Sequence, residues 1–293
     1  MKLTSHAGGV RALWEASLPD QAVGLAWLGQ AGFALRCAGC RLLIDPYLSD
    51  HLAHKYAGTE FPHQRIMPPP VNPEEIRHLD LVLCSHRHGD HMDPASLPAL
   101  AKNNPRCRFI VPRAEVESVV RLGVPETQLI PANDGDAVPV NDAVTIHVIP
   151  AAHEMLKVNQ RGHHHFLGFI LRLGAFMLYH SGDSVVYDGL AERLREWAID
   201  LALLPVNGRS EQLTSRGIMG NMNLDEAAAL CLAAGIHALI PHHFGMFAFN
   251  TVDPVGLQRQ AEGLDPRLRC WLPSVEQYFL LELATSTPRP DLL

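Results

Sequence analysis

Short apolar runs separated by polar turns dominate this 293-residue chain. Near its start, three such runs follow one another at 23–28, 33–36 and 41–44, with glycine-containing turns between them. Apolar runs of this length, bounded by turn residues, are typical of β-strands. The chain is therefore expected to open with three short strands.

Farther along the chain, strand-like runs alternate with stretches of helical periodicity. Strands are predicted at 107–111, 143–149, 166–173, 176–180, 201–206, 237–240 and 277–283. Helices are predicted at 93–102, 113–122, 187–198 and 223–235, and another starts at Asp253-Pro254. Both halves of the chain place strands first and strand–helix alternation afterwards. This plan predicts two sheets with helices on their outer faces.

Length and composition fit one ordinary globular domain. Hydrophobic residues make up 47% of the chain and charged residues 19%, which is typical of globular proteins. Since no linker is evident, the whole chain, 1–293, is expected to form a single domain with its core at about 22–284. The Pro-rich tail at 285–293 is expected to be frayed.

Two segments allow more than one interpretation. Residues 47–78 form a long, Pro-rich and weakly periodic stretch, which is either a lid or binding loop over a site or a plain insertion. Cys37-Ala38-Gly39-Cys40 has the spacing of half a zinc site or a redox pair. A two-residue hairpin turn flanked by cysteines is the favoured interpretation, because no second CxxC and no helix pattern accompany it.

The charge pattern limits the partners of the protein. The formal net charge is −7, and the chain has no long run of Lys or Arg. This argues against a nucleic acid partner, since phosphate binding requires a basic surface, but it allows a small anionic substrate. No signal peptide and no apolar run of about 18 residues is evident. We therefore expect a cytoplasmic protein without a membrane-spanning segment.

The densest cluster of potential metal ligands follows the apolar run at 79–85. Within six residues the chain presents His86, His88, Asp90 and His91. His86 and His88 point to the same side of an extended backbone, because side chains alternate along a strand. Imidazole and carboxylate groups are ligands for zinc, manganese and iron.

The same event recurs elsewhere in the chain, where an apolar strand ends and a polar residue follows at once. It delivers His153, Asp183, His243, Asp45 and Asn207. Strand ends at one edge of an α/β sheet converge on a shared crevice. The four residues at 86–91, together with His153, Asp183 and His243, offer five histidines and two carboxylates, which are too many for one four-coordinate ion. Two ions about 3.5–4 Å apart, sharing a carboxylate and a water, would use them all.

At this point the chain resembles a known superfamily. His86-Arg87-His88-Gly89-Asp90-His91 matches the HxHxDH signature of the metallo-β-lactamase superfamily, and within it the chain is similar to the L-ascorbate-6-phosphate lactonase-like hydrolases. The matching stretches lie at 27–33, 43–46, 86–91, 179–184 and 240–243. The resemblance implies an α/β protein (also classed α+β) built as a four-layer αββα sandwich, with metals at one edge.

The resemblance also implies roles for individual residues. One ion would be held by His86, His88 and His153, and a second by Asp90, His91 and His243. Asp183 would bridge the two ions, and Asp45 would steady the HxHxDH loop. His242 is taken as a neighbour that is not a ligand.

Two features depart from the lactonase pattern and leave the substrate open. The lactonase lacks a histidine at the place of His153; a histidine there is common in the superfamily and favours a full two-metal site. The His163-His164-His165 run is not a family signature. It either lines the pocket and meets an anionic substrate or forms a hairpin loop with solvated imidazoles.

The mechanism expected from this site is hydrolysis. Two ions would lower the pKa of a bridging water, and the resulting hydroxide would attack a carbonyl carbon or a phosphorus. Asp90 and Asp183 are the candidate catalytic carboxylates, Asp90 by orienting the nucleophile or moving its proton. The candidate substrate-binding residues are Asn207, Arg209, His165 and Gln30.

The leading functional interpretation is a metal-dependent hydrolase of a small anionic metabolite such as a (phospho)sugar lactone. The first alternative is a phosphodiesterase, similar to N-acyl phosphatidylethanolamine phospholipase D or acting on a cyclic or small phosphodiester. The alternative of another class is a non-catalytic metal-binding protein. The expected cofactors are two divalent ions, zinc or manganese with iron also suitable, and the resemblance allows a homo-oligomer.

Overall fold

A computed structural model describes residues 1–283, and the predicted frayed tail lies outside the described residues. Two large sheets form its centre. The first sheet has the order β1 (Lys2–Ala7), β17 (Gln277–Glu282), β2 (Val23–Gly29), β3 (Gly32–Cys37), β4 (Cys40–Ile44), β5 (Leu81–Leu83), β6 (Arg108–Pro112) and β7 (Leu129–Ala132). The second has the order β16 (Arg269–Cys270), β15 (Ala238–His242), β14 (Leu201–Pro205), β13 (Phe176–His180), β12 (Leu167–Leu173), β9 (Val144–Pro150) and β8 (Ala137–Pro139).

Each sheet has an antiparallel part and a parallel part, because short hairpin turns connect some strands and longer crossovers connect others. β3 and β4 pair antiparallel across the two-residue turn Ala38-Gly39, where both residues have positive φ (46° and 73°), as a tight hairpin turn requires. From β4 to β7 and from β13 to β16 the pairing is parallel. Parallel neighbours need longer crossovers, so the carboxyl ends of these strands share one edge of each sheet.

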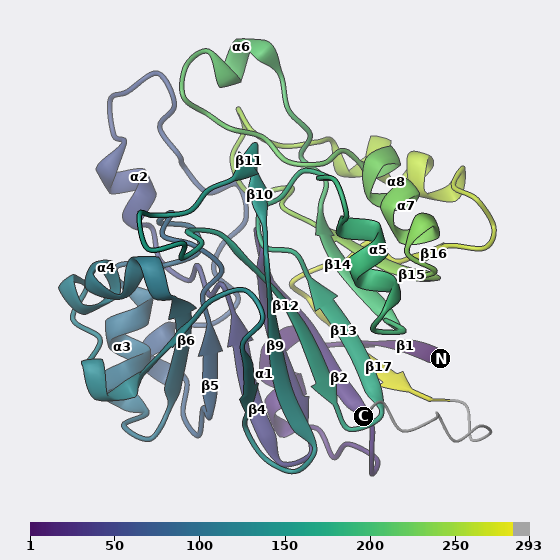
Figure 1. Ribbon diagram of the computed structural model, residues 1–293, viewed down its shortest axis with the longest axis horizontal. Helices are drawn as coiled ribbons and strands as arrows, with labels where there is room; N and C mark the ends of the chain where they lie inside the picture. The colour runs from purple at the N-terminus through teal and green to yellow at the C-terminus, as the bar shows by residue number, and fades with distance from the viewer. Residues whose placement is uncertain (284–293) are drawn as a thin grey trace.

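Helices cover the outer face of each sheet, so the fold has four layers (Figure 1). The first sheet is covered by α1 (Gly9–Glu15), α3 (Ser96–Asn103) and α4 (Val116–Arg121). The second is covered by α5 (Leu190–Arg195), α7 (Leu224–Ala233) and α8 (Pro254–Glu262). The predicted αββα sandwich is confirmed.

Alternation along the strands divides the core in two. In β2, Leu25 and Trp27 belong to the cluster between the sheets, whereas Ala26 and Leu28 belong to the cluster under the helices. Both faces of a central strand are buried in this way, which explains why its sequence is apolar throughout rather than alternating.

The prediction that the core starts at about residue 22 was wrong. β1 and α1 precede that point, and Val10 and Leu13 are fully buried against the first sheet. β1 is an edge strand whose side chains are mostly exposed, so it lacks the apolar run by which strands are recognised. The predicted helix at 93–102 also begins later, at Ser96, because the Asp93 carboxylate accepts hydrogen bonds from Ser49 and from the first turn of the helix.

The hairpin interpretation of Cys37 and Cys40 is confirmed. The two residues face each other across the turn, and neither forms a disulfide. Burial raises the pKa of each thiol to about 12. These thiols therefore behave as small apolar side chains.

The loops and small elements gather at one end of the sandwich, at the top of Figure 1. They comprise α2 (His51–Lys55), the hairpin of β10 (Ala152–His153) and β11 (Met155–Leu156), and α6 (Glu211–Thr214). α2 lies within the long stretch at 47–78, which is otherwise mostly irregular. Among residues 1–283, no helix is long and apolar enough to cross a bilayer.

Candidate metal centre

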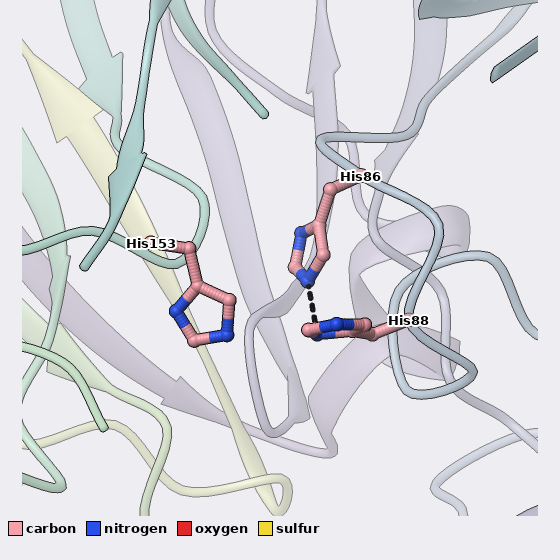
Figure 2. Close-up of side chains that lie close together, drawn as sticks. All are labelled: His86, His88 and His153. Carbon is pink, nitrogen blue, oxygen red and sulfur yellow. Dashed lines mark hydrogen bonds between the residues drawn. The ribbon is translucent and has the colours of Figure 1, made fainter. Parts of the chain in front are cut away.

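Three histidines meet where β5 and β9 deliver their carboxyl ends to the same edge. Figure 2 shows the rings of His86, His88 and His153 turned toward a common space, and His86 Nε2 lies 2.9 Å from His88 Nδ1. One ring nitrogen from each of the three lies within 4.8 Å of the others. The structure thus brings together the first predicted ligand group.

A second group lies beside the first. It consists of Asp90, His91 and His243, again with one ligand atom of each within 4.8 Å of the others. Asp183 stands between the two groups, because it also clusters with His86 and His91. Its Oδ1 lies 3.3 Å from His91 Nε2, and its Oδ2 lies 3.2 Å from His243 Nε2.

The donor atoms themselves test whether metal ions fit here. His91 Nε2 and Asp183 Oδ1 are buried and make no hydrogen bond within the described part of the chain. Leaving buried polar atoms unpaired is costly, and such atoms are explained where they serve as metal ligands. Neutral imidazole nitrogens and carboxylate oxygens suit zinc, manganese and iron. The residues therefore fit divalent metal ions.

Asp45 fixes the orientation of the histidines from behind. It follows β4 and is fully buried, and its Oδ2 lies 2.8 Å from His91 Nδ1. Its carboxylate also accepts hydrogen bonds from the backbone N–H and the hydroxyl of Ser85. Because Nδ1–H of His91 donates to Asp45, the lone pair of Nε2 faces the site. The Ser85 hydroxyl lies 3.0 Å from His86 Nδ1 and orients that ring in the same way.

Replacing Asp45 with asparagine is expected to weaken metal binding by about 10- to 100-fold, since it removes the acceptor that holds the His91 ring. Titration of the metal-stripped protein with zinc against a competing chelator measures the affinity. Asp80→Asn is the matched control: its Oδ2 accepts a backbone N–H from Arg41 at the surface. Equal zinc affinities in the two variants would contradict the role given to Asp45.

A tight turn carries Asp183 to the site. Gly182 follows β13 with a φ of +61°, and a Cβ at this position would lie 2.7 Å from Ser85 Cβ and 2.8 Å from the Leu167 carbonyl oxygen. The Gly182 N–H donates to His180 Nδ1, and His180 Nε2 lies 2.9 Å from the Ala31 carbonyl. Only glycine fits this close approach between the sheets.

Gln30 lies behind the candidate ligands rather than in front of them. Its Nε2 donates to Asp90 Oδ2 at 2.8 Å and lies 3.1 Å from His243 Nε2. The side chain is 1% exposed. Gln30 and His243 both have positive φ, and the His243 N–H donates to the Gln30 carbonyl. Gln30, predicted as a substrate contact, therefore contacts two candidate ligands instead.

The electrostatics of the site favour a cation between the carboxylates. Burial lowers the pKa of His86 well below its usual value and lowers that of His153 to about 4. Both rings are therefore neutral, the form that binds metal. Burial alone would also lower the pKa of His91, but Asp183 and Asp45 raise it well above its usual value. The carboxylates that attract a proton here also attract a metal ion.

Five of the seven candidate ligands line a cavity of about 950 Å³, namely His88, Asp90, His153, Asp183 and His243; His86 and His91 are buried beneath them. Its walls come from two loops, residues 52–63 around α2 and residues 216–219 after α6, together with residues 247–250. Part of the stretch at 47–78 thus forms one wall of this cavity. Three positively charged side chains line the cavity, and the sequence analysis missed all of them: Lys55, Arg87 and Arg216.

Three predicted substrate contacts lie outside the lining of this cavity. Arg209 donates to both carboxylate oxygens of Glu226, the residue that forms the capping box of α7. Asn207 bonds to other asparagines, and both residues line a separate, smaller cavity. His165 Nδ1 lies 2.6 Å from the buried Glu115 carboxylate. The structure therefore does not bring these three side chains to the candidate metal centre.

Comparison with known proteins agrees with this geometry. Residues 40–244, more than half of the chain, match the model of the Beta-lactamase superfamily domain. A UPF0173 metal-dependent hydrolase of Pyrobaculum aerophilum is 26% identical over 243 residues, covering 82% of this chain and 92% of the relative. A UPF0173 metal-dependent hydrolase of Myxococcus xanthus is 28% identical over 247 residues, covering 82% and 77%.

A solved structure shows the same fold. The metallo hydrolase Igni18 of Ignicoccus hospitalis superposes with a TM-score of 0.66 at 19% identity, covering 90% of this chain and 100% of that structure. The resemblance to the superfamily is thereby confirmed. The chain belongs to the metallo-β-lactamase superfamily and is a metal-dependent hydrolase.

Proposed function

We propose that this protein hydrolyses the ester or lactone bond of a small anionic metabolite at a two-metal centre. One observation carries the proposal: the three overlapping donor groups lie together, and five of their seven residues line a cavity of about 950 Å³. A purely structural metal site closes its coordination with protein ligands, whereas a catalytic one keeps positions open to solvent.

The candidate ions, zinc or manganese with iron also suitable, would supply activation of water and neutralisation of developing negative charge. The protein residues divide the remaining tasks. Asp183, between His91 and His243, would hold the two ions at a fixed spacing. Burial alone would raise the pKa of Asp90, but His91 and His243 lower it below its usual value. Asp90 therefore stays ionised, held by Gln30, and is able to accept a proton from the attacking water.

The reaction balances as a simple hydrolysis. The water oxygen forms a new bond to the acyl carbon, and the bond from that carbon to the leaving oxygen breaks. The proton that Asp90 accepts passes to the leaving oxygen, so an ester gives a carboxylic acid and an alcohol, and a lactone opens to a single hydroxy acid. No serine or cysteine nucleophile is required.

The cations of the cavity support an anionic substrate. Arg87, within the HxHxDH motif, has its Nε 3.9 Å from Glu115 Oε1, and its side chain is 62% exposed. Lys55 lies over the Tyr56 ring, with Nζ 5.0 Å from the ring centroid. Because the same cations and ions suit a phosphodiester equally well, phosphodiester hydrolysis is the second candidate function.

Metal content and turnover, measured together, test the proposal. The purified protein is expected to hold close to two metal ions per chain and to hydrolyse members of a lactone panel. Chelation should abolish turnover, and zinc or manganese should restore it. Turnover of bis-p-nitrophenyl phosphate but of no lactone would favour the phosphodiesterase. A metal-loaded protein inactive on both classes would favour a non-catalytic metal-binding protein.

A further inference from the structure

We infer that the cavity contains a subsite for a flat aromatic or similarly large apolar group of the substrate. This subsite is formed by the aromatic wall, defined as Tyr56, Phe61, His63, Phe247 and Phe249. The inference rests on the proposed function and adds to it the class of substrate. It places the apolar group of the substrate beside the bond that is hydrolysed.

The rings of the aromatic wall are arranged as one continuous surface. The centroids of His63 and Phe249 lie 4.7 Å apart at 67°, and those of Phe61 and Phe249 lie 5.1 Å apart at 51°. Phe247 and Phe249 stack nearly parallel, 5.9 Å apart at 7°. Tyr56 stacks on His63 at 4.3 Å. The three spacings that involve Phe249 are within the range of favourable ring pairs, and Tyr56 and His63 are in close stacking contact.

The wall joins two segments that are far apart in sequence. Tyr56, Phe61 and His63 belong to the loop around α2, whereas Phe247 and Phe249 follow the candidate ligand His243. Phe247 is 2% exposed and supports the others from behind. Phe61, His63 and Phe249 are only half-buried, and they line the same cavity as the candidate ligands. They therefore present apolar surface to whatever enters the cavity.

The histidine in the wall acts as an uncharged ring. Burial lowers the pKa of His63 below its usual value, and its Nδ1 lies 2.6 Å from the Phe61 carbonyl oxygen. The ring is therefore neutral near pH 7, with Nδ1–H donating to that carbonyl. A neutral ring wedged against Phe247 and Phe249 continues the apolar surface rather than interrupting it with a charge.

The loop after α6 adds further apolar residues to the lining of the cavity. Ile218 and Met219, after α6, also line the cavity and are half-buried. Arg216 on the same loop forms an ion pair with Glu60, which neutralises it. A small, fully polar sugar would leave these apolar side chains without an apolar partner. A substrate with an aryl or branched alkyl group next to its scissile ester matches the lining better.

A pair of carboxylates that differ only in a phenyl group tests the inference by binding alone. Titration calorimetry on the metal-loaded protein compares 3-phenylpropanoate with propanoate. We expect the phenyl compound to bind at least about tenfold more tightly. Phe249→Ala should reduce this preference about three- to tenfold, the size of one ring contact. Phe249→Tyr should retain it, because the ring is kept.

Two further variants guard against a general loss of structure. Phe61→Ala, on the other segment, should reduce the preference in the same direction. Ile66→Ala is the matched control, because Ile66 lies on the same loop, is 58% exposed and is outside the cavity lining. Three results would overturn the inference: a phenyl preference that is unchanged in both Phe249→Ala and Phe61→Ala, no preference in the wild type, or no binding of either acid. The proposed function is judged separately, by turnover of the substrate panel.

Discussion

Replacing Asp183 with asparagine is expected to reduce turnover by at least about a thousandfold, since a metal ion contributes several kcal/mol to the transition state. The amide removes the negative charge that faces both His91 and His243 at 3.2–3.3 Å. Metal analysis should show the loss of at least one ion per chain. The turnover number on the best substrate of the panel and the metal content per chain are the two measurements.

A nearby carboxylate provides the control for this variant. Asp188 lies five residues farther along and is exposed, so Asp188→Asn should retain full metal content and turnover. If the Asp183 variant held two ions and kept wild-type turnover, the bridging role would be wrong. If it lost turnover but kept both ions, Asp183 would act in chemistry rather than in holding the metals.

Gly182→Ala is expected to lower the free energy of unfolding by about 3 kcal/mol or more, because two costs add at this position. The backbone has a φ of +61°, and the added methyl group would meet Ser85 Cβ and the Leu167 carbonyl at under 3 Å. Chemical denaturation of the metal-free protein measures the effect. Because Gly182 sets the direction of Asp183, zinc affinity should fall as well.

Gly174→Ala separates the two costs. Gly174 ends β12 with a φ of +64°, nearly the same as Gly182, but no atom lies within 4 Å of the added methyl group. The free energy of unfolding of this variant should therefore fall by only about 1–2 kcal/mol, the cost of a positive φ at a residue with a Cβ. An equal loss of stability in both variants would show that the close approach between Gly182 and Ser85 contributes nothing.

The candidate ligands were predictable because each one follows an apolar run. His153, Asp183 and His243 follow β9, β13 and β15 of the second sheet, and strand ends at one edge of an α/β sheet converge. Asp45 was predictable for the same reason, since it follows β4 directly. The residues that directly follow apolar strands therefore predict most of the candidate metal centre.

The walls of the cavity were not predictable, because loops have no periodicity that fixes the direction of a side chain. Arg209 illustrates this. It follows a strand near the site, yet it pairs with Glu226, which also closes the capping box of α7. His165 pairs with Glu115, fifty residues away in sequence. The direction of such side chains depends on pairs between residues far apart in sequence, which no local pattern reveals.

The order of strands in the first sheet has a consequence for the synthesis of the chain. Within residues 1–283, β1 joins this sheet only through β17, which lies between β1 and β2. During synthesis, β1 therefore has no neighbouring strand to pair with until β17 has been made. All seven candidate ligands, the last of which is His243, precede β17 in the chain. The candidate metal centre is thus synthesised completely before this edge of the first sheet can form.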